Sequence, residues 1–196
     1  LTTLTLDLAS SMQVTAVRLV GGPALSFTHP GAALHITLPS PQSPGTLLEV
    51  DIGYRGIPVE DDNGNFVFGT RTVTTPTIAT YLYAWSLSEP YGAREWWPCK
   101  DHPSDKADSV RVTVTVPSIY RVGSQGLLVS ETTNGGNKTF DWVSNYPISN
   151  YLVSIAVSDY TRYLASYVRP APLAALYGPL TMPLDHLVYN DGSNAL

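Results

Sequence analysis

The chain has 196 residues, of which 43% are apolar and 14% are charged, and its net charge at pH 7 is −5. A chain of this length can bury a substantial core, and the low charged fraction predicts a surface or interface that is mostly uncharged. The sequence has no block of like charges, and no apolar segment reaches the roughly 20 residues that span a bilayer. We therefore expect no nucleic acid and no membrane as a partner.

Short runs of alternating apolar and polar residues recur along the chain and predict β-strands. Clusters of Gly, Pro and Asn separate them, as expected of turns. A single short helical turn is predicted at residues 103–107, where Pro103 would stand at the first position. We therefore predict an all-β domain, in which two sheets pack face to face or bend over one another. The predicted strands are residues 3–8, 14–20, 33–39, 47–54, 110–117 and 151–160.

The pattern changes near residue 163, where the chain becomes rich in proline and shows one more strand, at residues 184–190. Proline-rich extended chain commonly leads from one domain to the next. We therefore assign residues 1–165 to the β-domain, and residues 166–196 to its last strand or strands and an exit segment toward a further domain. The start at Leu1, without methionine, also suggests a fragment of a longer protein.

Motifs that carry chemistry are sparse. The sequence lacks HExxH, CxxC, a P-loop, GxGxxG and a hydrolase elbow. The tightest cluster of potential metal ligands is Cys99, Asp101 and His102, whereas zinc takes about four ligands, or three and a water. The alternative is a loop whose polar side chains satisfy backbone groups. Cys99 is the only cysteine, and burial as a small apolar side chain is favoured over a reactive thiol.

Aromatic residues allow two interpretations. They could form a sugar-stacking platform on a β-sandwich, or they could fill the core and anchor a long loop, which is the commoner use of tryptophan. The residues concerned are Trp85, Tyr91, Trp96, Trp97 and Trp142. Separately, Asn137 begins an Asn-Lys-Thr triplet, the acceptor pattern for N-glycosylation, in a predicted hairpin turn.

Glu89 is a candidate functional acid. It precedes Pro90 and follows the strand-like sequence TYLYAWSLS, so its backbone is expected outside the helical region, at the end of a strand. On these residues alone, a solvated or salt-bridged carboxylate and an acid that contacts a substrate both remain open.

The segment EPYGAREWWPCKDHPSDKADSVRVTVTVP resembles the amino-terminal domain of the M1 family of zinc aminopeptidases, the aminopeptidase N family. An acid before proline, an Ala-Arg pair, an aromatic-Pro-Cys triplet, an Asp-x-Pro, and a Lys-Ala before a strand ending in Val-Pro carry the resemblance. It continues through GYRGIP, SQGLL, FDWVSNYPISNYLVSIAVSDY and MPLDHLVY. The matching positions are Glu89, Pro90, Ala93, Arg94, Trp97, Pro98, Cys99, Asp101, Pro103, Lys106, Ala107, Val116 and Pro117.

The resemblance implies a saddle-shaped, antiparallel or mixed β-sandwich that covers a separate catalytic domain. It also implies that zinc is held by that absent domain, and that this chain contributes no metal ligand or catalytic residue. Glu89 matches the family's Gln or Glu that binds the free amino terminus of a peptide, for which a charge-assisted hydrogen bond is suited. Arg94, Asp101 and Lys106 would form an ion-pair network that fixes the loop. The implied partners are the chain's own catalytic domain and peptide amino termini.

Two positions depart from the family pattern. Leu87 stands where some members carry a second Gln, and His102 stands where the family often has Glu. Two alternative functions stay open: a carbohydrate-binding β-sandwich that uses the tryptophans, and a non-catalytic scaffold of the same family. The sequence does not determine the cellular compartment, although the low charge, the abundance of uncharged polar residues and the lone cysteine weakly favour an exported protein.

Overall fold

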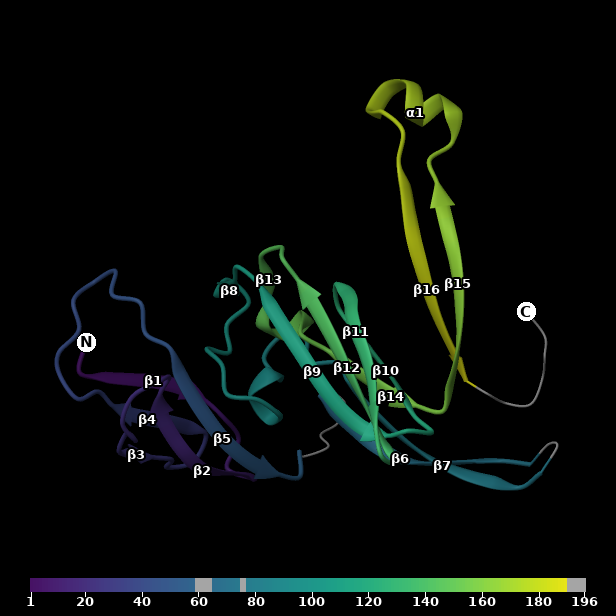
Figure 1. Ribbon diagram of the computed structural model, residues 1–196. Helices are drawn as coiled ribbons and strands as arrows, with labels where there is room; N and C mark the ends of the chain where they lie inside the picture. The colour runs from purple at the N-terminus through teal and green to yellow at the C-terminus, as the bar shows by residue number, and fades with distance from the viewer. Residues whose placement is uncertain (59–64, 75–76, 190–196) are drawn as a thin grey trace.

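A computed structural model describes residues 1–58, 65–74 and 77–189 of the chain. The predicted all-β fold is confirmed, and the strands pair antiparallel. Figure 1 shows a group of strands at the N-terminal end, a central pair of sheets, and an arm of two strands that projects from the centre. We describe these three parts in turn because the candidate site lies on a loop of the central part that contacts the first part through a bridge between Asp7 and Cys99.

The N-terminal part contains a three-stranded sheet and a two-stranded ribbon. Its core consists of Val17, Leu25, Leu34 and Ile36, and the alternation in the sequence places Leu34 and Ile36 on the same buried face. The sheet has the order β1 (Thr3–Asp7), β4 (Ala33–Thr37), β3 (Phe27–Thr28), and the ribbon pairs β2 (Met12–Leu19) with β5 (Val50–Gly56).

The central part is a β-sandwich. Its core joins Val122 and Val157 of one sheet to Phe140 and Trp142 of the other. One sheet has the order β10 (Arg121–Ser124), β14 (Ile155–Ser158), β7 (Ala79–Ser86), β6 (Phe66–Val73), and the other has the order β11 (Leu127–Asn134), β12 (Asn137–Ser144), β9 (Val110–Pro117). The valines of β9 alternate strictly with more exposed residues, as period-two patterning requires.

The loop between β7 and β9 holds two short elements, η1 (Ala93–Glu95) and β8 (Lys106–Ala107). The helical turn predicted at residues 103–107 is wrong. Lys106 and Ala107 instead pair with β13 (Ile148–Ser149), which is followed by η2 (Asn150–Leu152). The Ser149 hydroxyl also donates to the Pro103 carbonyl over 2.8 Å, so contacts with a distant segment override the local helical preference.

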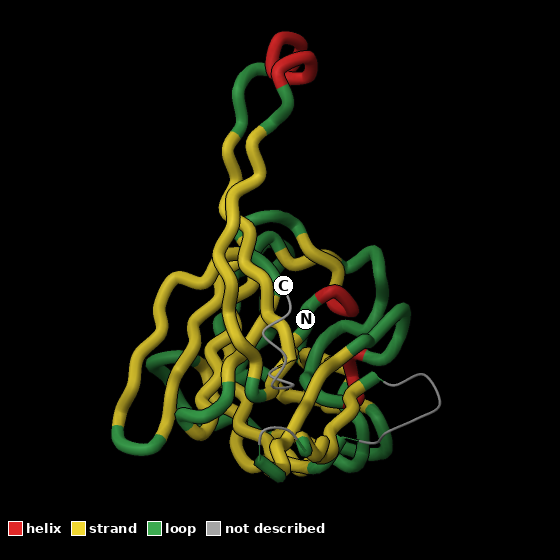
Figure 2. Tube along the Cα trace, turned by 90° about the vertical axis from the view of Figure 1, so that its right-hand side faces the viewer, coloured by secondary structure: helices red, strands yellow, loops and turns green. Residues whose placement is uncertain are grey.

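The arm consists of β15 (Tyr160–Val168) and β16 (Thr181–Tyr189), with α1 (Ala171–Tyr177) at its tip (Figures 1 and 2). The strand predicted at residues 184–190 is confirmed as part of β16, apart from Asn190, which lies outside the described residues. Sequence reasoning missed α1, although Pro172 near its start and Gly178 after its end are typical helix signals. At the root of the arm, the Arg71 guanidinium binds the Asp159 carboxylate and lies 4.6 Å from the centroid of the Tyr189 ring.

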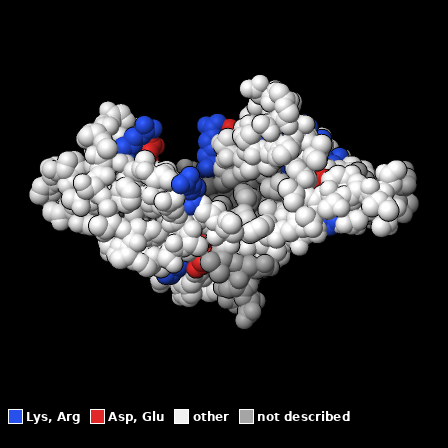
Figure 3. Space-filling model, turned by 90° about the horizontal axis from the view of Figure 1, so that it is seen from below, with Lys and Arg blue, Asp and Glu red and all other residues white. Residues whose placement is uncertain are grey.

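Charged side chains are few on the face shown in Figure 3, where they form small separate groups on an otherwise uncharged surface. Across the described ranges, no helix combines the length and apolar character needed to cross a membrane.

Candidate functional site

Glu89 lies in a turn that begins just after β7 ends at Ser86, and its side chain is exposed. The Glu89–Pro90 peptide bond is cis. The residues on either side differ sharply in burial, since Ser88 is 1% exposed and Tyr91 is 54% exposed. Leu87 is also exposed, so Ser88 is an isolated buried position at the base of a surface turn that presents Glu89 just after the end of a strand, as the sequence predicted.

Hydrogen bonds hold this turn from both sides. The Trp96 indole Nε1 donates to Ser88 Oγ over 3.0 Å, and the Ser88 hydroxyl donates to the Asn65 carbonyl at 3.4 Å. The backbone N–H of Leu87 donates to the same carbonyl over 3.3 Å, and the N–H of Gly92 donates to the Ser88 carbonyl over 2.9 Å. The Glu89 turn is thus attached to Asn65, just before β6, and to Trp96 in the loop that follows the turn.

Gly92 is required by close packing beneath the turn. A Cβ atom at this position would lie 1.7 Å from Oδ1 of Asn65, so no larger residue fits without moving Asn65. Asn65 is itself buried. The Trp96 ring lies beside Phe66 of β6, with 5.7 Å between the ring centroids. Close packing therefore adds to the hydrogen bonds that fix the Glu89 turn.

A buried carboxylate, Asp101, organises the rest of the loop. Its Oδ2 accepts a hydrogen bond from Arg94 Nε at 2.7 Å, and its Oδ1 accepts one from Asn150 Nδ2 at 2.6 Å. The Asp101 backbone N–H donates to Asp7 Oδ2 over 2.9 Å, and the Arg94 guanidinium lies 3.8 Å from the Asp7 carboxylate. The hydrogen bond to Asp101 raises the pKa of Arg94, so the guanidinium stays charged. We call this set, Asp7, Arg94, Asp101 and Asn150, the brace.

The predicted network is confirmed for Arg94 and Asp101 but not for Lys106. Lys106 pairs through its backbone with Ser149, whereas the lysine that forms an ion pair in this loop is Lys100, 3.4 Å from Asp105. No local feature of the sequence indicates the contributions of Asp7 and Asn150. Each of them lies far along the chain from the loop that it supports.

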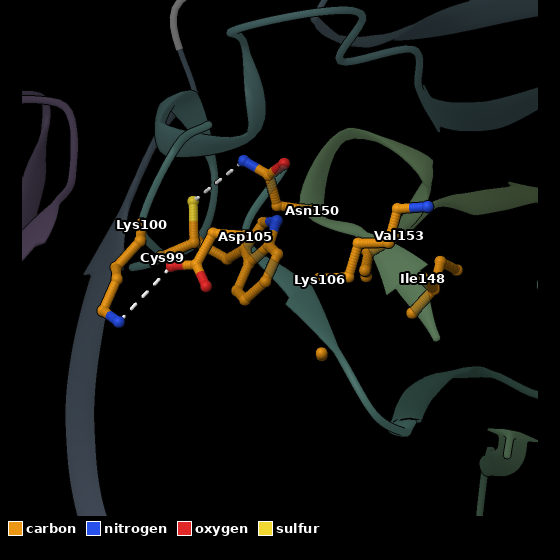
Figure 4. A pocket seen from close by; sticks show the side chains of 9 residues that line it. Cys99, Lys100, Asp105, Lys106, Ile148, Asn150 and Val153 are labelled. Atoms are coloured by element: carbon orange, nitrogen blue, oxygen red, sulfur yellow. Dashed lines mark hydrogen bonds and ion pairs between the residues drawn. The ribbon is translucent and has the colours of Figure 1, made fainter. Parts of the chain in front are cut away.

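Cys99 lines a pocket of about 190 Å³ beside the brace, together with Trp97, Lys106 and Asn150 (Figure 4). Burial, together with the nearby Asp101 carboxylate, raises the pKa of the Cys99 thiol to about 12. A thiol that stays protonated is a poor nucleophile and a poor metal ligand. The predicted burial of Cys99 is confirmed, and Cys99 acts as a small buried side chain that fills space beside the brace.

The candidate metal cluster of Cys99, Asp101 and His102 does not form. Asp101 is engaged by Arg94 and Asn150, while the His102 ring nitrogen Nδ1 lies 2.7 Å from Ser104 Oγ. Within residues 1–58, 65–74 and 77–189, no three His, Cys, Asp or Glu side chains gather so as to hold a metal ion.

The aromatic residues are arranged as packing rather than as a platform. All four tryptophans are buried or half-buried. Trp142 belongs to the sandwich core, and Trp96 packs between Phe66 and Trp97. Only Tyr91 of the five candidate aromatics is exposed, and its ring lies 6.2 Å from that of His102. A sugar-stacking surface requires exposed flat rings, so this arrangement favours the packing interpretation.

Residues 7–152 match the profile of a protein family described as the Peptidase M1 N-terminal domain. The chain belongs to this family. The range that matches the M1 N-terminal domain begins at Asp7 and ends at Leu152. It therefore contains the Glu89 turn and all four members of the brace, while the arm lies beyond it. The resemblance that the sequence showed is confirmed.

Known relatives are aminopeptidases and zinc metallopeptidases. Glutamyl aminopeptidase of Rattus norvegicus is 29% identical over 118 residues, which are 60% of this chain and 12% of that protein. Leucine aminopeptidase 2 of Vanderwaltozyma polyspora is 35% identical over 79 residues, 39% of this chain and 11% of that protein. The chain thus spans only a small part of these relatives.

Solved structures agree with the fold. An M1 zinc metallopeptidase mutant from Deinococcus radiodurans, bound to a Tyr-Ser-Ala substrate, superposes with a TM-score of 0.74 at 27% identity. The match covers 95% of this chain and 40% of that one. A second structure of the M1 zinc metallopeptidase from this organism gives a TM-score of 0.67 at 29% identity, over 87% and 36% of the two chains. The β-sandwich of the M1 N-terminal domain is therefore the fold of this chain.

Proposed function

We propose that this M1 N-terminal domain binds the free amino terminus of a peptide through Glu89, while a separate catalytic domain cleaves the peptide bond. The observation that carries the proposal is the exposed Glu89 carboxylate on a turn whose base, at Ser88, is buried. Family membership and the peptide substrate in the related Deinococcus structure support it. The zinc named for that relative does not fit the described residues here, which offer no suitable set of donors.

The chemistry of such an anchor is simple. A glutamate side chain and a peptide α-ammonium group carry opposite charges near neutral pH. A hydrogen bond between charged groups is about twice as strong as one between neutral groups. An exopeptidase must bind the amino terminus at a fixed distance from the bond to be cleaved, so a carboxylate held on a rigid turn both binds and orients the peptide.

The arm is proposed as the segment that reaches the catalytic domain. Two strands alone are marginally stable in water, yet this arm exposes several large apolar side chains. They include Leu164, Val168, Leu176 and Tyr177. The division expected after residue 165 falls within β15, so we assign the contact to the whole arm together with the exit segment at residues 166–196. Docked in this way, the domain would cover the active site beside Glu89.

The test is the hydrolysis of peptides with a free amino terminus by the full-length protein. Glu89→Ala is expected to lower kcat/KM by about ten- to a hundredfold, or about 1.4 to 3 kcal/mol, because a charge-assisted hydrogen bond is lost. Glu49→Ala, at another exposed glutamate, serves as the control and should leave kcat/KM unchanged. Equal kinetics for Glu89→Ala and the unmodified protein would refute the anchor. A full-length protein without any peptidase activity would favour the non-catalytic scaffold.

A further inference from the structure

The hydrogen bond from Trp96 to Ser88 connects the Glu89 turn to a side chain that packs against the sheet of the central part. Ser88 precedes Glu89 directly and is buried, so any movement of Ser88 also moves the backbone of Glu89. Its hydroxyl accepts from the Trp96 indole at 3.0 Å. The same hydroxyl donates to the Asn65 carbonyl at 3.4 Å, so one side chain links two segments.

The Trp96 ring is well placed to fix Ser88. It lies against Phe66, whose strand β6 pairs with β7, the strand that leads into the Glu89 turn. In that pairing Phe66 is directly opposite Ser86, two residues before Ser88. The ring is therefore held against the sheet from which the turn emerges, and its N–H reaches the buried hydroxyl at the base of the turn.

We propose that Ser88 and Trp96 are positioning residues for Glu89. Neither would touch the substrate. Together they hold the backbone of Glu89 so that its carboxylate meets the α-ammonium group of the peptide at one distance and angle. A displacement of about 1 Å in a binding group can cost a large factor in rate, because the reacting atoms are no longer aligned. This inference rests on the anchoring role proposed for Glu89.

Trp97 supplies a matched control. It is adjacent to Trp96 and is also half-buried, but its buried indole Nε1 has no hydrogen-bond partner in the part of the chain that the structure describes. Replacement of either tryptophan by phenylalanine removes one indole N–H and part of one ring. Only at Trp96 does the change break a hydrogen bond to the Glu89 turn.

The experiment measures kcat and KM of the full-length protein on an amino-acid p-nitroanilide, which carries a free α-amino group. Trp96→Phe and Ser88→Ala are each expected to lower kcat/KM by about five- to twentyfold, and Trp97→Phe by less than about twofold. In a protein that already carries Glu89→Ala, Trp96→Phe should cause no further loss, because residues that act through the same group are not additive. Thermal unfolding of each variant shows whether it is folded.

The outcomes separate the two proposals. If Glu89→Ala lowers kcat/KM but Trp96→Phe and Ser88→Ala do not, the positioning role is wrong and the anchor stands. If Glu89→Ala has no effect, both are wrong. A loss from Trp96→Phe that persists in the Glu89→Ala protein, or that Trp97→Phe reproduces, overturns the positioning role in favour of general packing. Ser88→Ala leaves both rings intact, so it tests the same hydrogen bond even if Trp96→Phe fails to fold.

Discussion

Replacement of Asp101 by alanine is expected to destabilise the chain strongly, because this carboxylate is fully buried and serves two side chains. Its side chain is 0% exposed, whereas that of Arg94 is 30% exposed. Among the residues that the structure describes, the Arg94 guanidinium in Asp101→Ala keeps only the carboxylate of Asp7, at 3.8 Å. The amide nitrogen of Asn150 keeps only the Cys99 sulfur, at 3.9 Å, and the amide oxygen already has no hydrogen-bond partner among the described residues.

The magnitude follows from these two losses. A buried polar group left without a partner costs about 1–3 kcal/mol, which applies to the Asn150 amide. Breaking a buried ion pair costs about 3–5 kcal/mol, but the partial exposure of Arg94 lets water replace part of that interaction. We therefore expect the free energy of unfolding to fall by about 3 kcal/mol. For a chain of this size, that corresponds to a Tm lower by about 6–12 °C.

The control is a pair with the same atoms and almost the same geometry at the surface. Arg18 Nε donates to Asp51 Oδ2 over 2.9 Å, with side chains 65% and 49% exposed. Asp51→Ala should therefore cost only about 0–1 kcal/mol. Both variants are measured by urea unfolding followed through tryptophan fluorescence. If they lose the same free energy, burial does not decide the strength of these pairs and the reasoning fails.

Two further predictions concern protonation. Because burial raises its pKa to about 12, the Cys99 thiol should resist iodoacetamide at neutral pH in the folded chain and react in denaturant. Mass spectrometry can follow the alkylation. Equally rapid alkylation of the folded and the denatured chain would contradict this prediction. The hydrogen bond from Arg111 lowers the pKa of Asp141 below its ordinary 3.8, so their interaction stabilises the fold above that value and is lost as the pH falls through the lowered pKa. The unfolding free energies of the unmodified chain and of Asp141→Asn should therefore differ at about pH 7 and converge as the pH falls to about 2. A difference that stays constant with pH would refute the lowered pKa of Asp141.

Several strands, among them β1, β2, β4, β5 and β9, could be predicted from the sequence because their signal is local, whereas the strand predicted at residues 151–160 is divided, with η2 at its start and β14 only from Ile155. In β9 each valine is more buried than the residue that follows it, so the alternation alone defines the two faces. The turn expected at residues 103–107 was wrong because Lys106 and Ala107 find partners in β13, about 40 residues later along the chain. In the arm, α1 was not predicted because its short run of Ala and Leu lies within a proline-rich segment, which indicates extended chain.

The same limit applies to the candidate site. The position of Glu89 at a strand end and the pairing of Arg94 with Asp101 both depend on residues close in sequence, and both could be predicted. Asn65 and Asn150 could not, because they lie 23 and 49 residues from the groups that they contact. A single sequence does not indicate which distant polar side chain will complete a hydrogen bond.

The brace also constrains the order in which the chain can fold. Asp101 is 94 residues after Asp7 and 49 residues before Asn150, and it contacts both. Contacts between distant segments form slowly, because a long loop must close before the contact can stabilise it. During synthesis from the amino terminus, β1 can pair with β4 early, but the contact of Asp7 with Asp101 must wait for residue 101, and the brace is completed only after residue 150 has emerged. A nascent chain that already contains Glu89 still lacks the complete brace that fixes the rest of the loop after the Glu89 turn.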